Sequence, residues 1–175
     1  LTVTDATISG NRAAHGGGVY NRGELTVEES RISDNVAVYG GGGVFNIGAL
    51  TIRDSSLAGN SATAGGGIAV LAQSVNATVT IVDSRLAGNT AETGGGVYAY
   101  TDGSGTTTVS LSNALFEANT ATGGAGAIDL FANGGRGLTA IAANSRFADN
   151  SGGRGGALGA RAKGGPLAVN VSDTT

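Results

Sequence analysis

Apolar and polar positions recur in one fixed phrase along this 175-residue chain. All but the last of the six phrases open with an apolar residue, a hydroxyl residue and a second apolar residue, as in Leu25-Thr26-Val27, and the last opens with Ala140-Ile141-Ala142. An (I/L/F)-x-x-N motif follows, and a cluster of glycines comes soon after it. The opening alternation has the two-residue period of a strand with one buried face, and it is too short for the apolar stripe of a helix. Each phrase therefore predicts a strand at its start.

The phrase repeats at an interval that lengthens along the chain. Its asparagine falls at Asn11, Asn35, Asn60, Asn89, Asn119 and Asn150, so the intervals are 24, 25, 29, 30 and 31 residues. Self-similarity at a period in this range is typical of a solenoid, in which each repeat packs only on its neighbours.

Two further apolar columns complete each repeat. One is the large apolar residue of the motif (Ile8, Ile32, Leu57, Leu86, Phe116 and Phe147), and the other follows the glycines (Val19, Val44, Ile68, Val97, Ile128 and Leu158). Three short strands per turn, without a helical segment, predict an all-β fold: a parallel β-helix of about six to seven turns. We expect residues 1–175 to form a single domain.

The recurring asparagines and glycines have structural explanations. An asparagine side chain both donates and accepts hydrogen bonds, so copies in successive turns can satisfy one another in a buried ladder. Glycines at 16–18, 40–43, 65–67 and 94–96 would supply positive φ angles where the chain bends between strands. The acidic column Asp5, Glu29, Asp54 and Asp83, continued by Asn113 and Asn144, is explained by turns at another corner.

Composition restricts the chemistry. The chain has no Cys and no Met, and His15 is its only histidine, so a cysteine-based or histidine-based metal site and a Ser-His-Asp triad are excluded. We expect no cofactor and no metal. A net charge of −3 disfavours nucleic acid and anionic membranes as partners.

The first residue already lies inside a repeat, and residues 167–171 begin another one. Solenoids need capping segments at their ends, and no such segment is recognisable here. We therefore expect an excerpt of a longer exported chain that packs against the rest of that chain at both ends. A signal peptide or membrane anchor would lie outside this stretch.

Several phrases resemble a known repeat. "FEAN" at 116–119, "FADN" at 147–150 and "GGAL" at 155–158 resemble the FxxN and GGA(I/L/V) repeats of the chlamydial polymorphic outer membrane protein family. The earlier phrases, such as "ISGN" and "GGGVYN", depart from it by replacing Phe with Ile or Leu and are similar to the broader set of bacterial surface β-helix repeats. The resemblance implies a right-handed β-helix at the outer surface of a bacterium or outside the cell, in adhesion or display, without catalytic residues.

The outer face of the third strand is the candidate binding surface. Its outward positions hold an apolar and aromatic stripe that the loops at 72–78, 101–108 and 132–137 could cover or leave exposed. If exposed, the stripe would suit a glycan or a host or cell-surface protein. The candidate residues are Tyr20, Phe45, Ile47, Leu71, Tyr98, Tyr100, Asp129, Phe131 and Arg161.

Polysaccharide cleavage is the alternative function. It would require paired carboxylates, or a metal-bound carboxylate cluster with a base, on one sheet, and the third strand carries Asp129 without an acidic neighbour in its column. We predict a structural or adhesive, non-catalytic β-helix, with a carbohydrate-binding or pectate-lyase-like, polysaccharide-cleaving β-helix as the second candidate.

Overall fold

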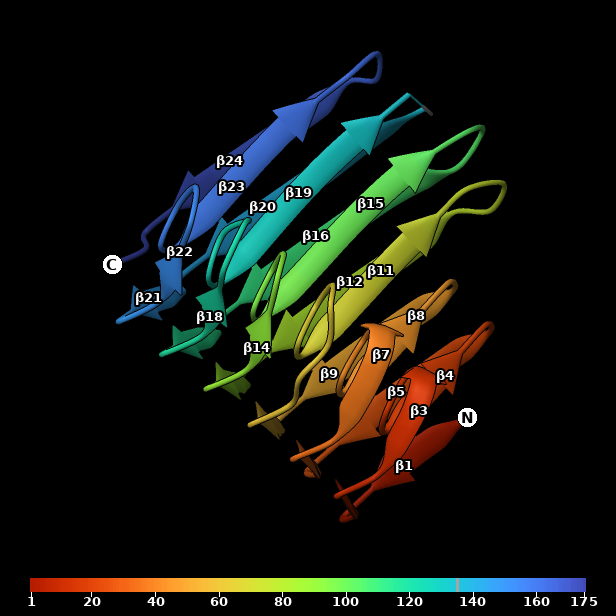
Figure 1. Cartoon of the computed structure of the whole chain (residues 1–175), viewed down its shortest axis with the longest axis vertical. Coiled ribbons are helices and arrows are strands. Elements are labelled where there is room, and N and C mark those ends of the chain that lie inside the picture. The colour runs from red at the N-terminus through yellow and green to blue at the C-terminus, as the bar shows by residue number, and fades with distance from the viewer. Residues whose placement is uncertain (135) are drawn as a thin grey trace.

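The computed structural model describes residues 1–134 and 136–175, and these residues form an all-β parallel solenoid (Figure 1). The described residues contain no helix. Successive coils stack from the N-terminal to the C-terminal end, and every described strand pairs in parallel with its copies in the adjacent coils. This is the predicted parallel β-helix.

The first sheet contains the strands that open each phrase. Its register pairs like with like, as in Thr26 with Thr51 and Val27 with Ile52. Its strands, in spatial order, are β1 (Thr2–Thr4), β5 (Glu24–Glu28), β9 (Ala49–Arg53), β12 (Ala77–Val82), β16 (Thr106–Ser112), β20 (Gly137–Ala143) and β24 (Leu167–Ser172).

The second sheet carries the large apolar residue of the (I/L/F)-x-x-N motif. Leu57 pairs with Ile32 on one side and with Leu86 on the other. Its strands are β2 (Thr7–Ser9), β6 (Arg31–Ser33), β10 (Ser56–Ala58), β13 (Arg85–Ala87), β17 (Leu115–Glu117) and β21 (Arg146–Ala148).

The third sheet follows the glycine clusters. Its first two strands are shorter than the four that follow: β4 (Val19–Asn21), β8 (Val44–Asn46), β11 (Ile68–Ala72), β15 (Val97–Asp102), β19 (Ile128–Asn133) and β23 (Leu158–Ala162). The two six-stranded sheets each span five coil-to-coil steps and the seven-stranded first sheet spans six, slightly fewer than the six to seven turns predicted.

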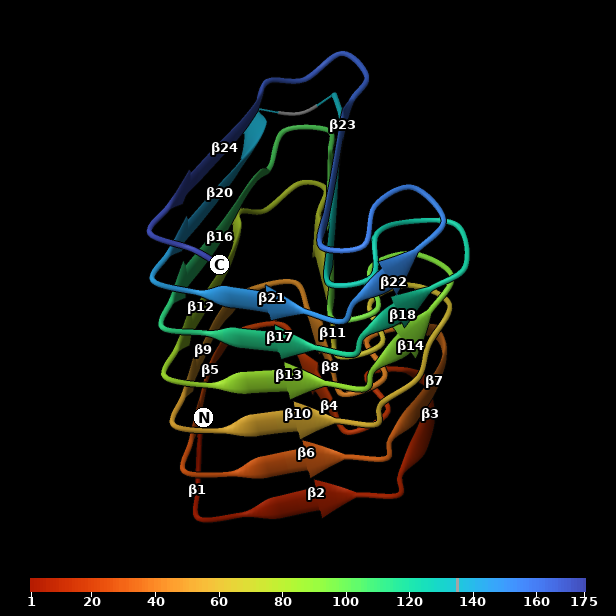
Figure 2. The same ribbon diagram turned by 90° about the vertical axis from the view of Figure 1, so that its left-hand side faces the viewer.

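A fourth set of short strands stands at the corner between the second and third sheets, outside the core (Figure 2). We call it the corner ladder: β3 (Arg12–His15), β7 (Val36–Gly40), β14 (Thr90–Ala91), β18 (Thr120–Ala121) and β22 (Ser151–Gly152). The sequence interpretation of three strands per turn missed it, because three of these strands have only two residues, too few to show alternation, and β3 and β7 have no four- or five-residue equivalent in later coils.

The hydrophobic core lies between the three main sheets. Ile52, Leu57 and Ile68, one from each sheet in the same coil, have no exposed surface. Equivalent positions in the neighbouring coils continue these columns, so each coil buries its apolar side chains against copies of themselves.

The glycine clusters perform two tasks instead of the single one predicted. In each of the four predicted clusters one glycine has positive φ, such as Gly41 at 66°. Its neighbour Gly42 is needed for another reason, because a Cβ atom there would collide with the backbone of Gly66 and Ser61 in the next coil. The clusters thus both turn the chain and let adjacent coils approach closely.

Candidate functional site

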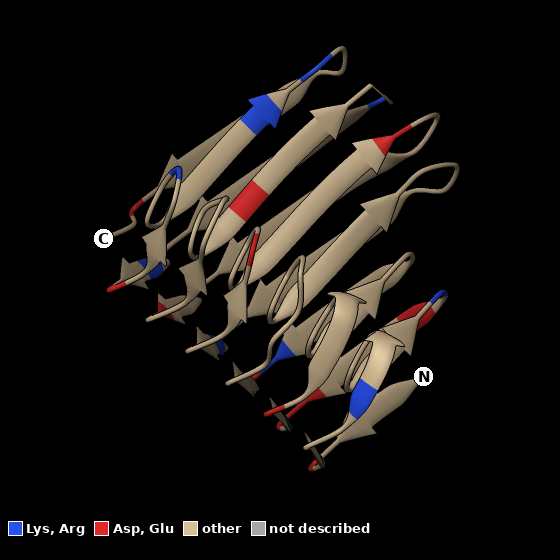
Figure 3. Ribbon diagram, viewed as in Figure 1, with Lys and Arg blue, Asp and Glu red and all other residues tan. Residues whose placement is uncertain are grey.

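The outer face of the third sheet presents two columns of side chains. In register, Phe45, Ala69 and Tyr98 are neighbours in one column, and Leu71 pairs with Tyr100 and Tyr100 with Phe131 in the other. Within the strands of this sheet the charged residues are Asp102, Asp129 and Arg161, so its ribbon is largely uncharged in Figure 3. The register therefore brings the predicted candidate residues onto one surface.

At the N-terminal end of this face the rings stack. Tyr20 and Phe45 lie with ring centroids 5.3 Å apart and planes inclined by 15°. Tyr20 is 48% exposed, whereas Phe45 is only 7% exposed. Phe45 is therefore partly a packing residue, because another part of the chain covers it.

That cover comes from the corner ladder, which the sequence interpretation did not include in the site. His15 lies with its ring centroid 4.7 Å from that of Phe45 and 5.2 Å from that of Tyr39, which is itself 60% exposed. His15 aligns with Gly40 of the next coil across a register shift in the ladder. The available signal was the position of His15 and Tyr39 directly before glycine clusters.

Between the corner ladder and the third sheet lies an open groove of about 250 Å³. We call it the aromatic groove. Small residues line its middle, and rings line its two ends; the lining residues are His15, Tyr39, Gly40, Phe45, Ala64, Ala69, Val70, Leu71, Tyr98 and Tyr100. Four of them, Phe45, Leu71, Tyr98 and Tyr100, are predicted candidate residues.

From the end of the groove, three half-buried rings, Tyr98, Tyr100 and Phe131, continue along the sheet. The centroids of Tyr98 and Tyr100 are 6.4 Å apart, and those of Tyr100 and Phe131 are 5.6 Å apart. The Tyr100 hydroxyl donates to Asp102 at 3.0 Å and accepts from the Asn133 side chain at 2.9 Å. These bonds fix the Tyr100 ring and leave its faces for contact.

Asp129 and Arg161 form an ion pair beside these rings. Asp129 is 1% exposed, and one of its oxygens lies 3.3 Å from the Arg161 Nη2 atom. The backbone NH of Ala125 donates to the other oxygen, and the Arg161 guanidinium lies 4.7 Å from the centre of the Phe131 ring. The carboxylate is thus held in a buried structural pair, a poor arrangement for a general base.

Tyr98 lies between the groove and this ion pair. Burial raises the pKa of Tyr98 to about 12; the charge of Arg161 opposes the shift, while Asp129 adds to it. The phenol therefore remains protonated at physiological pH and is available as a hydrogen-bond donor.

The longer loops stack on one another instead of folding over the rings. The backbone NH of Gly105 donates to Gln73 O at 2.9 Å, and the NH of Thr106 donates to the Asn76 side chain at 3.0 Å. Figure 2 shows these loops extending past the core, where the third sheet passes into the first. Residue 135 of the loop at 132–137 lies outside the described residues. Ile47 and Leu71 are half-buried beside Gln73 and Val75.

The motif asparagines form a continuous ladder inside the second corner, where the second sheet passes into the corner ladder. Asn35, Asn60, Asn89 and Asn119 have no exposed surface. Asn60 accepts at Oδ1 from the backbone and side-chain NH groups of Asn35, at 3.1 Å each, and its Nδ2 donates to Asn89 Oδ1 and Ile32 O at 3.0 Å. Asn11 and Asn150 end the series with bonds of the same kind. Every polar atom of Asn60 is used within the chain, so this column has no free group for a ligand.

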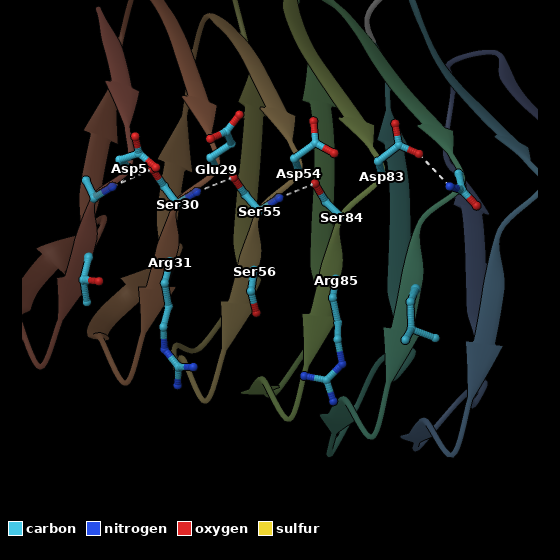
Figure 4. Close-up of a pocket in the computed structure, with 14 residues that line it drawn as sticks. Asp5, Glu29, Ser30, Arg31, Asp54, Ser55, Ser56, Asp83, Ser84 and Arg85 are labelled. Carbon is cyan, nitrogen blue, oxygen red and sulfur yellow. Dashed lines mark hydrogen bonds between the residues drawn. The ribbon is translucent and has the colours of Figure 1, made fainter.

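The acidic column borders a shallow groove of about 730 Å³ at the first corner, where the first sheet passes into the second (Figure 4). Asp5, Glu29, Asp54 and Asp83 are exposed, and each has a positive φ near 50°. Beneath them, serines form a second ladder, as Ser30 NH donates to Ser55 Oγ and Ser55 NH to Ser84 Oγ, at 3.0 Å each. Among the described residues, no group of three or more His, Cys, Asp or Glu is placed to hold a metal ion.

Comparisons with known proteins did not identify a relative of this chain. No protein-family model matches the chain, and no match was found among curated proteins or among solved structures. In the part of the chain that the structure describes, no helix has the length and apolar character to cross a membrane.

Proposed function

We propose that this β-helix is a non-catalytic adhesive segment of a secreted or bacterial cell-surface protein, similar to an adhesin or an autotransporter passenger. Its parallel solenoid fold suits a structural or surface role. The resemblance of its FxxN and GGAL phrases to chlamydial outer-membrane-protein repeats supports the same assignment. Its partner would be a host or cell-surface protein or a glycan.

The observation that carries this proposal is the ring-lined outer face of the third sheet. Tyr98, Tyr100 and Phe131 are half-buried, so their rings are held in place while part of each remains available. Rigid aromatic side chains supply contact area at low conformational cost, and they are enriched in binding interfaces. A partner would contact this face together with Ile47, Leu71 and Arg161.

The carboxylates of this face do not support hydrolysis. By register Asp129 aligns with Tyr98, four residues before Asp102, which places the two acids about 13 Å apart along the sheet. Glycosidases hold their two carboxyl groups at about 5 to 9.5 Å. The Asp129 carboxylate also forms an ion pair with Arg161. A carbohydrate-binding β-helix remains the second candidate, because aromatic faces beside Arg161 and Tyr98 also suit sugar rings.

Binding assays on a double variant test the proposal. We expect Tyr98→Ser with Tyr100→Ser to abolish binding to host-cell surfaces or to array-bound glycans, with an unchanged circular dichroism spectrum. Ile141→Ser is the matched control, because Ile141 is 43% exposed on the first sheet and away from the rings. Unchanged binding by the double variant would refute the proposed face. Binding confined to glycans would favour the second candidate.

A further inference from the structure

The arginine at the C-terminal end of the third sheet is only partly used inside the chain. Arg161 reaches the two oxygens of Asp129 through a single nitrogen, Nη2, at 3.3 and 3.4 Å, whereas strong charge-assisted bonds measure about 2.7 to 2.9 Å. Its Nε atom is buried without a partner, and no bond joins Nη1 to a described residue. The side chain is 34% exposed. The guanidinium therefore keeps N–H donors for another acceptor.

Arg161 continues a column of rings. In register, Tyr100 pairs with Phe131 and Phe131 with Arg161, so two rings and a cation follow one another in adjacent coils. The centre of the Phe131 ring lies 5.6 Å from that of Tyr100 and 4.7 Å from the guanidinium carbon. Both distances are close to the strand spacing of about 4.8 Å. A ligand as wide as one coil can therefore touch a ring and the guanidinium together.

The charge of this end of the chain favours an anion. Residues 136–163 contain five of the ten basic residues but only one of the thirteen acidic residues, Asp149. Figure 3 shows basic residues in blue on β23, which carries Arg161, and in the loop after it, which begins with Lys163. The nearby Asp129 is 1% exposed and lies against Arg161. A chain with a net charge of −3 thus presents a locally basic surface here.

A sugar that carries an acidic group fits these features. The carbon-rich face of a sugar ring can pack against aromatic side chains, and a carboxylate or sulfate group on that ring can accept hydrogen bonds from a guanidinium. The Tyr98 hydroxyl has no partner among the described residues and can donate to a sugar hydroxyl. An acidic peptide side chain would bring the charge without the ring face.

We propose that Tyr100, Phe131 and Arg161 bind an anionic sugar of a surface glycan, with the sugar ring against the two aromatic rings and its carboxylate or sulfate group on Arg161. The inference rests on the adhesive face proposed above and assigns to that face a glycan with negative charge. Lys163 adds to the attraction by its charge.

Matched sugars test the requirement for charge. Methyl glucuronide, glucose 6-sulfate and methyl glucoside would each be titrated into the whole chain while the Nε–H signal of Arg161 and the amide signal of Phe131 are followed by NMR. We expect an anionic sugar to bind with a Kd of about 1 mM and methyl glucoside to bind at least about tenfold more weakly, because it lacks the acidic group. The tighter of the two anionic sugars identifies that group as a carboxylate or a sulfate.

Removing the guanidinium identifies the site. Arg161→Gln leaves Asp129 buried without its cation, so Asp129→Asn with Arg161→Gln is the second variant, which retains neither charge. Each variant that thermal unfolding shows to be folded should bind the anionic sugar at least about tenfold more weakly than the unmodified chain. Arg146→Gln is the matched control, because it removes the same charge from an exposed position on the second sheet in the same coil.

Three outcomes would overturn the inference. In the first, neither anionic sugar binds more tightly than methyl glucoside. In the second, folded Asp129→Asn with Arg161→Gln keeps the affinity of the unmodified chain. In the third, tetraglutamate, which offers carboxylates without a sugar ring, shifts the same signals as strongly as the anionic sugar, so that charge alone is recognised.

A failure of this inference can be told apart from a failure of the proposed function. If Tyr98→Ser with Tyr100→Ser abolishes surface binding but no anionic sugar binds the chain, the adhesive face stands and the anionic-sugar inference fails. If an anionic sugar binds through Arg161 but the double tyrosine variant still binds the surface, the sugar site exists and the proposed adhesive face is wrong.

Discussion

Two ladders of related side chains run along this solenoid and behave in opposite ways. At the second corner, asparagines such as Asn60 are fully buried and bonded to both neighbours. At the first corner, acidic residues such as Asp54 are exposed, and the bond between side chains in that column joins Asn113 to Asp83 at 2.6 Å. An amide carries a donor and an acceptor, so identical copies satisfy one another, whereas identical carboxylates offer only acceptors and repel.

The largest expected effect comes from replacing a buried asparagine with an acidic residue of the kind found in the exposed column. Asn60→Asp would put a carboxylate oxygen where Nδ2 now donates to Ile32 O and Asn89 Oδ1, two acceptors. We expect a loss of about 3 to 5 kcal/mol in the free energy of unfolding at neutral pH. Because burial would raise the pKa of the new carboxyl, the loss should be smaller near pH 4 and grow as pH rises through the raised value. Urea unfolding at both pH values measures this, and an equal loss at both would contradict the explanation.

Removing the amide without adding charge should cost less. Asn60→Ala leaves the NH groups of Asn35 without their acceptor and Ile32 O without its donor. We expect a loss of about 1 to 3 kcal/mol in the free energy of unfolding, measured by the same urea titrations. A neutral result would mean that water replaces the amide in this ladder.

Tyr98 is a polar group whose burial is intermediate between the two ladders. Because the folded chain raises its pKa from 10.0 to about 12, its stabilising contribution is complete below pH 10 and is lost as pH rises through 12. We expect Tyr98→Phe to remove a late-titrating phenol from the ultraviolet absorbance titration and to reduce the fall in Tm at alkaline pH. Tyr20→Phe, which removes a 48% exposed phenol, is the control and should retain the late phenol.

The smallest effect is expected from replacing one carboxylate of the exposed acidic column with an amide. Asp54→Asn should relieve repulsion from Glu29 and Asp83 and create a donor like Asn113, raising the free energy of unfolding by about 0.2 to 1 kcal/mol. The gain should shrink in 1 M salt, where exposed charges are screened. Asp149→Asn is the matched control. Asp149 also has positive φ (53°), but the residue at the equivalent position of the preceding coil is the uncharged Ala118. An equal gain in both variants would contradict the repulsion argument.

Repetition made the fold predictable from the chain. Each apolar column, such as Ile52, Leu57 and Ile68 in one coil, recurs in the next, so a single short strand need not be recognised alone. The same columns predicted parallel pairing, because only parallel stacking places equivalent side chains side by side. The corner ladder escaped notice because its strands shrink to two residues in the later coils and so leave no alternation that recurs from coil to coil.

The site was predictable only in part. Alternation along the third strand indicated that Tyr98, Tyr100 and Phe131 face outward, and their register then followed from the stacking. That His15 and Tyr39 lie against Phe45 depends on how the corner segment folds back over the sheet. The pairing of Asp129 with Arg161 across coils also depends on side-chain direction, which residue order leaves open.

By itself, then, the sequence determined the parallel coil, its buried columns and which residues of the three main strands face inward or outward, because a repeated two-residue alternation has one consistent way to bury its apolar side chains. Only the tertiary structure decided which outward residues are covered. The aromatic groove exists because two segments separated by a glycine bend come together over Ala69, and that approach is set by the bend angle and by small side chains on both walls.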